Sequence, residues 1–222
     1  MRVIVFLALT ALVSADAFAV PVYWNTWASP SSGSLTTGSS TVAVTFATTN
    51  AHNNIPSYPT WSPSSTFEDG VLVDNGPAQA NGIMQLTGGT TALNTLTFST
   101  PVVNPVFAIW SLGQGGITAS FDFVGVTPVF VAGGSNAEYG GSAIVVSGNT
   151  VNGNEGNGTI QFIGTFSSIQ WTNPIFENWY GFNFGIADVG TPNSVPEPSP
   201  ALLFVLGLGL LIGFRTLARA RG

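Results

Sequence analysis

The chain has 222 residues, of which only 6 % are charged, and its formal net charge is −6. Its four Lys and Arg residues are Arg2, Arg215, Arg219 and Arg221, so residues 20–194 contain none. A surface without cations repels phosphate backbones and argues against a nucleic-acid partner, and the lack of Cys excludes disulfides and thiolate catalysis.

The first predicted element is a secretory signal peptide over residues 1–19. Arg2 precedes an apolar run from Val3 to Val13, and two overlapping A-x-A frames follow, the second ending at Ala19. Basic, apolar and small residues in this order are typical of a cleaved signal, and the apolar run is too short for a permanent span. We therefore expect export and cleavage after Ala19.

Residues 20–190 are the expected exported domain, and their pattern predicts an all-β fold, an antiparallel β-sandwich or jelly roll. Apolar residues alternate in TVAVTF, NTLTFS, ITASFDF, TIQFIG and YGFNFGI, and clusters of Gly and Asn separate these runs. In the last run, Tyr180, Phe182, Phe184 and Ile186 share one face. Short alternating strands with regular turn signals are typical of such folds. No helical period extends over three turns.

The motif N-P-[VI]-F-x-x-W occurs twice, over residues 104–110 and 173–179. Two interpretations stay open. Trp110 and Trp179 are candidate platforms on which a glycan ring stacks. Alternatively, the motif is a structural strand–turn–strand unit in which Asn-Pro turns the chain and Phe and Trp fill the core. The exposure of the Trp side chains distinguishes the two.

The residues that carry chemistry form no recognisable catalytic motif. His52 is the single His, lies in a predicted surface loop, and is accompanied by neither G-x-S-x-G nor H-E-x-x-H. Glu68 and Asp69 are adjacent acids, which suit a turn or half a calcium site better than a glycosidase pair. Glu68 and Glu177 are acids that a hydrolase cleft would combine. We expect no catalytic or metal-binding residue and no cofactor, with calcium as the alternative.

Asn157-Gly158-Thr159 is an N-x-T sequon. Such sequons are accepted for glycosylation on surface loops. Glu155, two residues before Asn157, resembles the acidic position that bacterial oligosaccharyltransferases prefer. Asn157 is therefore a candidate glycosylation site.

The C-terminal elements are a Pro-rich linker over residues 191–200, an apolar transmembrane helix over 201–218 and a basic cytoplasmic tail over 219–222. The unbroken apolar part, residues 201–214, gives a helix of roughly 21 Å, which is shorter than a bilayer core of about 30 Å. A span therefore needs the residues up to Ala218. Arg215, Arg219 and Arg221 then predict stop-transfer, with the tail on the cytoplasmic side.

Pro196-Glu197-Pro198, followed by a short apolar helix and terminal Arg residues, resembles the PEP-CTERM sorting signal. The resemblance covers residues 195–222. It implies that an exosortase, a membrane-embedded cysteine transpeptidase, recognises and removes the signal. It also implies that the protein ends at the cell surface or in the extracellular matrix of a Gram-negative bacterium. An ordinary single-span anchor with a Pro-rich linker is the alternative.

The expected function is that of a non-enzymatic surface or extracellular-matrix protein associated with exopolysaccharide or biofilm. Its expected partners are exosortase, the membrane during sorting, and exopolysaccharide. The alternative function is a secreted, lectin-like carbohydrate-binding module or, as a further alternative, a polysaccharide hydrolase.

Overall fold

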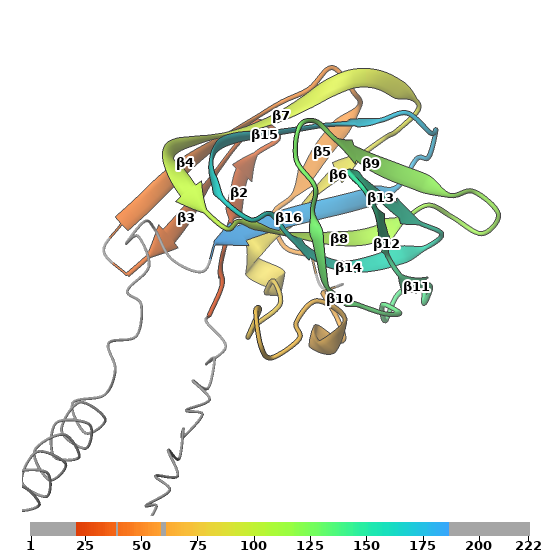
Figure 1. The fold of residues 1–222 in the computed structure, drawn as a ribbon, viewed down its shortest axis with the longest axis horizontal. Helices are drawn as coiled ribbons and strands as arrows, with labels where there is room; N and C mark the ends of the chain where they lie inside the picture. Colours follow the sequence, from red (N-terminus) through yellow and green to blue (C-terminus); the bar gives the residue numbers. More distant parts are fainter. Residues whose placement is uncertain (1–20, 39, 59–60, 187–222) are drawn as a thin grey trace, which may run out of the picture. The chain divides into compact units, whose positions relative to one another are not determined.

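The computed structural model describes residues 21–38, 40–58 and 61–186, which form two β-sheets (Figure 1). The predicted all-β, sandwich-like fold is confirmed for this part of the chain. Among the described residues, no helix combines the length and apolar character that crossing a bilayer requires. The signal peptide, the sorting motif at 196–198 and the three C-terminal Arg residues lie outside the described residues and stay predictions.

The first sheet has the strand order β10-β14-β8-β16-β6-β5, with β1 beside β16 and β11 beside β14. Its neighbouring strands are antiparallel, except that β11 and β14 are parallel. The strands are β1 (Tyr23–Trp24), β5 (His52–Ile55), β6 (Ile83–Leu86), β8 (Val106–Leu112), β10 (Val129–Gly133), β11 (Ser142–Ala143), β14 (Gly156–Gln161) and β16 (Tyr180–Ile186).

The second sheet has the order β12-β13-β9-β15-β7-β4-β3-β2, and all its pairings are antiparallel. The strands are β2 (Thr26–Ser29), β3 (Ser32–Thr37), β4 (Ser40–Ala47), β7 (Thr90–Val103), β9 (Ala119–Phe123), β12 (Val145–Ser147), β13 (Thr150–Gly153) and β15 (Thr165–Asn173).

The main core lies between the sheets and is rich in aromatic rings. Val42, Val44 and Phe46 of β4 point into it, as the period-two pattern predicts. Phe46 stacks on Trp171 at a centroid distance of 5.8 Å and meets Phe182 edge to face at 5.6 Å. Aromatic pairs of this kind contribute about 0.5–1.5 kcal/mol beyond their area burial, so the rings help to fix how the sheets pack.

The outer face of the first sheet is also covered. The connection from β5 to β6 carries two single-turn 3-10 helices, η1 (Ser64–Thr66) and η2 (Gln79–Asn81), and lies against this sheet (Figure 1). We call residues 56–58 and 61–82 the covering segment. A second buried cluster lies beneath it and comprises Val22, Trp24, Tyr58, Trp61, Phe67, Val73, Ile83, Val106, Ala108 and Trp110. As a result, β8, β14 and β16 are buried along both faces.

Asn183 fastens the covering segment to the sheet. Its Nδ2 donates to the carbonyl oxygens of Asn25, Asn81 and Gly82 at 3.0, 3.2 and 3.1 Å. Its Oδ1 accepts the backbone N–H of Phe184 at 2.7 Å. The side chain is fully buried. A polar residue on the nominally outward face of β16 is therefore a buried connector.

The repeated N-P motif marks two corresponding crossings between the sheets. The first joins β7 to β8 and the second joins β15 to β16, while β7 pairs with β15 and β8 with β16. In the first copy Phe107 and Trp110 are fully buried, as the structural interpretation predicts. In the second copy the chain forms a loop before β16, and Phe176 and Trp179 are 58 % and 47 % exposed.

Candidate functional site

The loop of residues 174–179, which we call the Trp179 loop, rests on a pair of glycines after β6. The backbone N–H of Gly88 donates to the carbonyl of Glu177 at 3.0 Å, and that of Gly89 donates to the carbonyl of Asn173 at 2.9 Å. A Cβ at Gly88 would overlap the carbonyl oxygen of Ile175. The two glycines thus let the backbone of the Trp179 loop lie close against the chain after β6, which holds Trp179 beside the first sheet.

Trp179 stands on a cluster of other aromatic rings. Its ring meets that of Trp110 at 6.4 Å and 73°, and Trp110 also contacts Tyr58 at 5.2 Å and Tyr139 at 5.5 Å. Trp110 is fully buried and offers no ring face to a ligand, which corrects its predicted role in glycan stacking. It supports Trp179 instead. The other four Trp residues are also buried, so Trp179 alone of the six is exposed.

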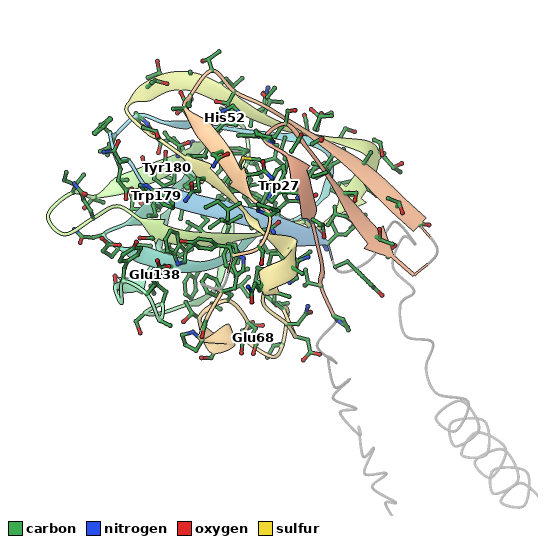
Figure 2. All side chains as sticks on the ribbon, turned by 180° about the vertical axis from the view of Figure 1, so that it is seen from behind. Trp27, His52, Glu68, Glu138, Trp179 and Tyr180 are labelled. Atoms are coloured by element: carbon green, nitrogen blue, oxygen red, sulfur yellow. The ribbon has the colours of Figure 1, made fainter. Side chains whose placement is uncertain are left out.

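An open cavity of about 210 Å³ lies beside Trp179. Figure 2 shows Tyr180 and Trp179 side by side, with His52 above them in the view, and both His52 and Trp179 line the cavity. The cavity is formed by β5 and its preceding residue, by β6 and its following residue, and by the Trp179 loop. Its lining is Ala51, His52, Asn53, Gln85, Leu86, Thr87, Asn178 and Trp179. This lining contains amides, a hydroxyl, the His52 imidazole and the Trp179 indole, but no carboxylate, Lys or Arg.

Gln85 lines this cavity, and its side chain carries a buried donor that is unsatisfied. It lies in register with Asn53 on β5 and with Gly181 on β16, and it is 9 % exposed. Its Nε2 has no hydrogen-bond partner among the described residues. The indole N–H of Trp110 lacks one as well. Buried polar groups are nearly always hydrogen-bonded, so an unmatched donor beside a cavity points to a missing partner.

His52 lies on strand β5, not in the predicted surface loop, and it is partly buried. Its Nδ1 is 2.8 Å from the carbonyl oxygen of Asn50, and its ring packs edge to face on Phe46 at 5.6 Å. The loop prediction was wrong because strand pairing with β6 overrides the weak strand propensity of the Asn residues around it. The His side chain forms one wall of the cavity.

A buried carboxyl lies within the Trp179 loop. Glu177 is 3 % exposed, and its Oε2 accepts the backbone N–H of Gly113 at 2.6 Å. Burial raises the pKa of Glu177 to about 7 against the lowering effect of this hydrogen bond, and the charge of Glu155 adds to the increase. Burial of Tyr180 raises the pKa of its hydroxyl, and the charge of Glu177 raises it further. This hydroxyl has no hydrogen-bond partner among the described residues.

Asn157 is the centre of a buried network, not an exposed sequon. Its Nδ2 donates to the carbonyls of Glu155, Gly140 and Gly134 at 2.9, 3.1 and 3.3 Å. Its Oδ1 accepts the N–H of Ser111 at 2.7 Å, and the side chain is fully buried. The predicted glycosylation at Asn157 is therefore wrong for the folded domain, because the acceptor nitrogen is inaccessible and already bonded.

Ser111 and Glu155 join this network in strained backbone conformations. Each has a φ of 52°, which non-glycine residues seldom adopt, and the Ser111 Oγ donates to the Glu155 Oε2 at 2.7 Å. Glu155 is the carboxylate whose charge acts on both Glu177 and Tyr139. Strain of this kind is often found near functional sites.

Glu68 and Asp69 lie in the covering segment and bind their own backbone. The Oε2 of Glu68 accepts the N–H of Gly76 at 2.9 Å. The Oδ1 of Asp69 accepts three N–H groups of residues 71–73 at 2.8–3.0 Å. Burial works to raise the pKa of Asp69, but these bonds bring it below its usual value. The two acids form a turn, as one interpretation predicts. Figure 2 shows Glu68 well apart from Trp179. Glu68 bonds to the backbone of the covering segment, whereas Glu177 bonds to Gly113.

No three His, Asp or Glu side chains of the described residues come together as a metal site requires. Calcium binding stays an untested alternative. Sequence reasoning missed Gln85, whose one signal was a polar residue within the apolar run IMQL. Comparisons of this chain with protein-family models, with curated proteins and with solved structures found no match.

Proposed function

We propose that this chain is an exported surface or extracellular-matrix protein, delivered by a C-terminal PEP-CTERM signal that exosortase removes. The observation that carries the proposal is the placement of the charges. The cationic residues flank two apolar segments at the chain ends, and Pro196-Glu197-Pro198 precedes the second. Arg on one side of each apolar segment orients it, so that everything between the two segments crosses the membrane.

The domain itself works by non-covalent binding rather than by catalysis. Residues 20–194 have no Lys and no Arg, which removes the usual anchors for phosphate and carboxylate groups. Binding must then use amides, hydroxyls and aromatic rings, which suits a neutral polysaccharide of the matrix. Glu177, the acid with the most strongly raised pKa among the described acids, is buried under its own loop and does not line the cavity.

A second candidate function is carbohydrate binding as a lectin-like module. One observation favours it: Trp179 combines a half-exposed ring with an adjacent polar cavity. Binding sites of this type use an apolar ring for contact area and a few placed polar groups for orientation. The two functions are compatible, since a matrix protein that binds its polysaccharide is retained by it.

The sorting proposal predicts that the mature protein is shorter at both ends. In cells with active exosortase, intact-mass analysis of the surface-extracted protein should show loss of residues 1–19 and of most residues after Pro198. Changing Pro196, Glu197 and Pro198 to Ala should trap the precursor in the inner membrane, because the Arg-flanked helix still stops transfer while the recognition segment is gone. Membrane fractionation measures this trapping.

The matched control is Pro192→Ala, which alters the linker outside the motif. It should leave delivery to the surface unchanged. Recovery of the full-length tail at the surface, or normal delivery of the triple-Ala variant, would show that the segment is an ordinary anchor with a Pro-rich linker.

A further inference from the structure

We propose that the cavity beside Trp179 is a subsite for one ring of a neutral sugar, with the Trp179 ring as its floor and the Gln85 amide as its buried hydrogen-bond donor. This inference rests on the second candidate function and names its site and ligand class. The sorting signal plays no part in it.

The first argument is shape. The cavity holds about 210 Å³, below the roughly 300 Å³ at which pockets for drug-sized ligands begin. A single sugar ring is a ligand of this smaller size. Trp179, 47 % exposed, lines the cavity as its proposed floor, and its ring is supported by an edge-to-face contact with the buried ring of Trp110. A platform that is already fixed loses little side-chain entropy when a ligand stacks on it.

The second argument is hydrogen bonding. Gln85 is nine-tenths buried at the cavity, and its Nε2 has no partner among the described residues. The last torsion of a Gln side chain is soft, so the amide can turn its donor into the cavity. Asn53, Thr87 and Asn178 add polar groups to the lining. Amides and hydroxyls both donate and accept, which matches the mixed character of sugar hydroxyls.

The third argument is charge. No carboxylate, Lys or Arg lines the cavity, and His52 is the one ionisable side chain in its lining. The cavity therefore has no permanent charge to anchor an ionic ligand. Residues 20–194 have no Lys or Arg to offset their acids, and the charges of Glu138 and Glu155 raise the pKa of Tyr139, whose ring contacts Trp110. This negative potential disfavours uronic acids and other anionic sugars. The site therefore takes neutral sugars and rejects anionic ones.

Binding is measured on the full-length chain in a zwitterionic detergent without a sugar headgroup. The neutral probes are cellohexaose, maltohexaose, mannohexaose and chitohexaose, and hexaguluronate is the anionic probe. Since Trp179 is the one exposed Trp of six, a bound sugar should protect it from acrylamide quenching of fluorescence. We expect at least one neutral probe to bind with this protection, and hexaguluronate to give none.

Three variants test the geometry. Trp179→Ala should weaken binding by about tenfold or more, as expected for an aromatic anchor. Trp179→Phe should keep a ring and give an intermediate affinity. Gln85→Leu should weaken binding by about threefold or more, while raising the melting temperature of the free protein, because an unsatisfied buried amide is replaced by an apolar group. A merely structural Gln85 would not produce this opposite pair of effects.

The control is Phe130→Ala on β10, an equally exposed ring at the opposite edge of the first sheet, which should leave binding unchanged. The proposal is overturned if no neutral probe binds, if hexaguluronate binds more tightly than every neutral probe, or if Trp179→Ala binds as well as the parent. It is also overturned if sedimentation shows that a second copy of the chain covers Trp179. None of these outcomes changes the sorting proposal, which depends on mass and fractionation.

Discussion

At the scale of single residues, the domain places polar groups where a local pattern suggests exposure. Asn157, Asn183 and Gln85 are all buried, but they differ in their hydrogen bonding. Asn157 and Asn183 make several hydrogen bonds each, whereas the Nε2 of Gln85 makes none among the described residues. The buried amides of Asn157 and Asn183 therefore hold the fold together, whereas Gln85 combines an unpaired donor with a place in the cavity lining, which is the basis of the proposed sugar subsite.

The raised pKa of Glu177 makes the stability of the domain depend on pH. Its folded-state pKa of about 7 lies above its ordinary value of 4.5 because of burial and the charge of Glu155. The folded state thus holds this proton more tightly than the unfolded chain, so the contribution of Glu177 to stability is complete below about pH 4.5 and is lost as pH rises through about 7. Between about pH 5 and about pH 8, the parent should lose on the order of 1–3 kcal/mol relative to Glu177→Gln.

Urea unfolding of both proteins at the two pH values measures this difference. Asp69→Asn is the contrasting variant, because the pKa of Asp69 is lowered and its contribution is instead lost at acid pH. If the parent and Glu177→Gln show the same dependence between about pH 5 and about pH 8, the Glu177 carboxyl is not held in a desolvated site.

At the scale of elements, the covering segment and the Trp179 loop are two connections that differ in the burial of their apolar side chains. The covering segment closes over β8 and β16 and buries its own aromatic residues. The Trp179 loop leaves Ile175, Phe176 and Trp179 exposed, although it repeats the residues that fill the core in the first copy. The difference arises because the first copy continues directly into β8, whereas the second first crosses the glycine pair after β6.

Gly88→Ala should therefore displace the Trp179 loop. The added methyl group would overlap the carbonyl oxygen of Ile175, which is backbone and can move only with the loop. We expect a loss of about 1–3 kcal/mol in unfolding free energy, as for other over-packed sites, and greater quenching of Trp179 by acrylamide. Gly115→Ala is the control, because a Cβ at that position meets open space. Equal effects of the two substitutions would contradict the close packing of the loop.

At the scale of the whole domain, the dominant feature is acidic surface charge without cations. Between residues 20 and 194 there are acids but no Lys or Arg, so their charges repel one another without compensation. Solubility must come from Ser, Thr, Asn and Gly, and cohesion from the aromatic core between the sheets. Such a domain responds to salt in the opposite sense to one that is stabilised by ion pairs.

Salt should therefore stabilise the domain. Raising NaCl from about 0.01 M to about 0.15 M shortens the Debye length from about 30 Å to about 8 Å and screens the repulsion among the acids. We expect the melting temperature to rise by roughly 2 °C, corresponding to about 0.5–1 kcal/mol. Differential scanning fluorimetry measures it. CaCl₂ at the same ionic strength should give the same rise, and a clearly larger rise would reveal the calcium site that the adjacent acids suggested.

The sequence by itself determined what depends on neighbours along the chain. Period-two alternation predicted strands in five runs, which overlap β4, β7, β9, β14 and β16. It also predicted the inward faces of β4, β9 and β16, because the pleat places alternate residues on opposite faces whatever the strand pairs with. The two chain-end signals rest on local order alone and stay predictions, because they lie outside the described residues. The adjacent acids Glu68 and Asp69 were expected to form a turn or half a calcium site. Asp69 does form a turn, and calcium binding stays untested.

The tertiary structure decided what depends on contacts between distant residues. The outer face of β16 is buried because a segment about 100 residues earlier in the chain folds over it. Burial makes Asn157 inaccessible and selects the structural interpretation of Trp110 over the glycan platform. Pairing with β6 places His52 on a strand. The cavity, the unmatched donor of Gln85 and the raised pKa of Glu177 arise where β5, β6 and the Trp179 loop meet. No sequence pattern encodes them, since desolvation and hydrogen-bond matching are set by which chain segments pack together.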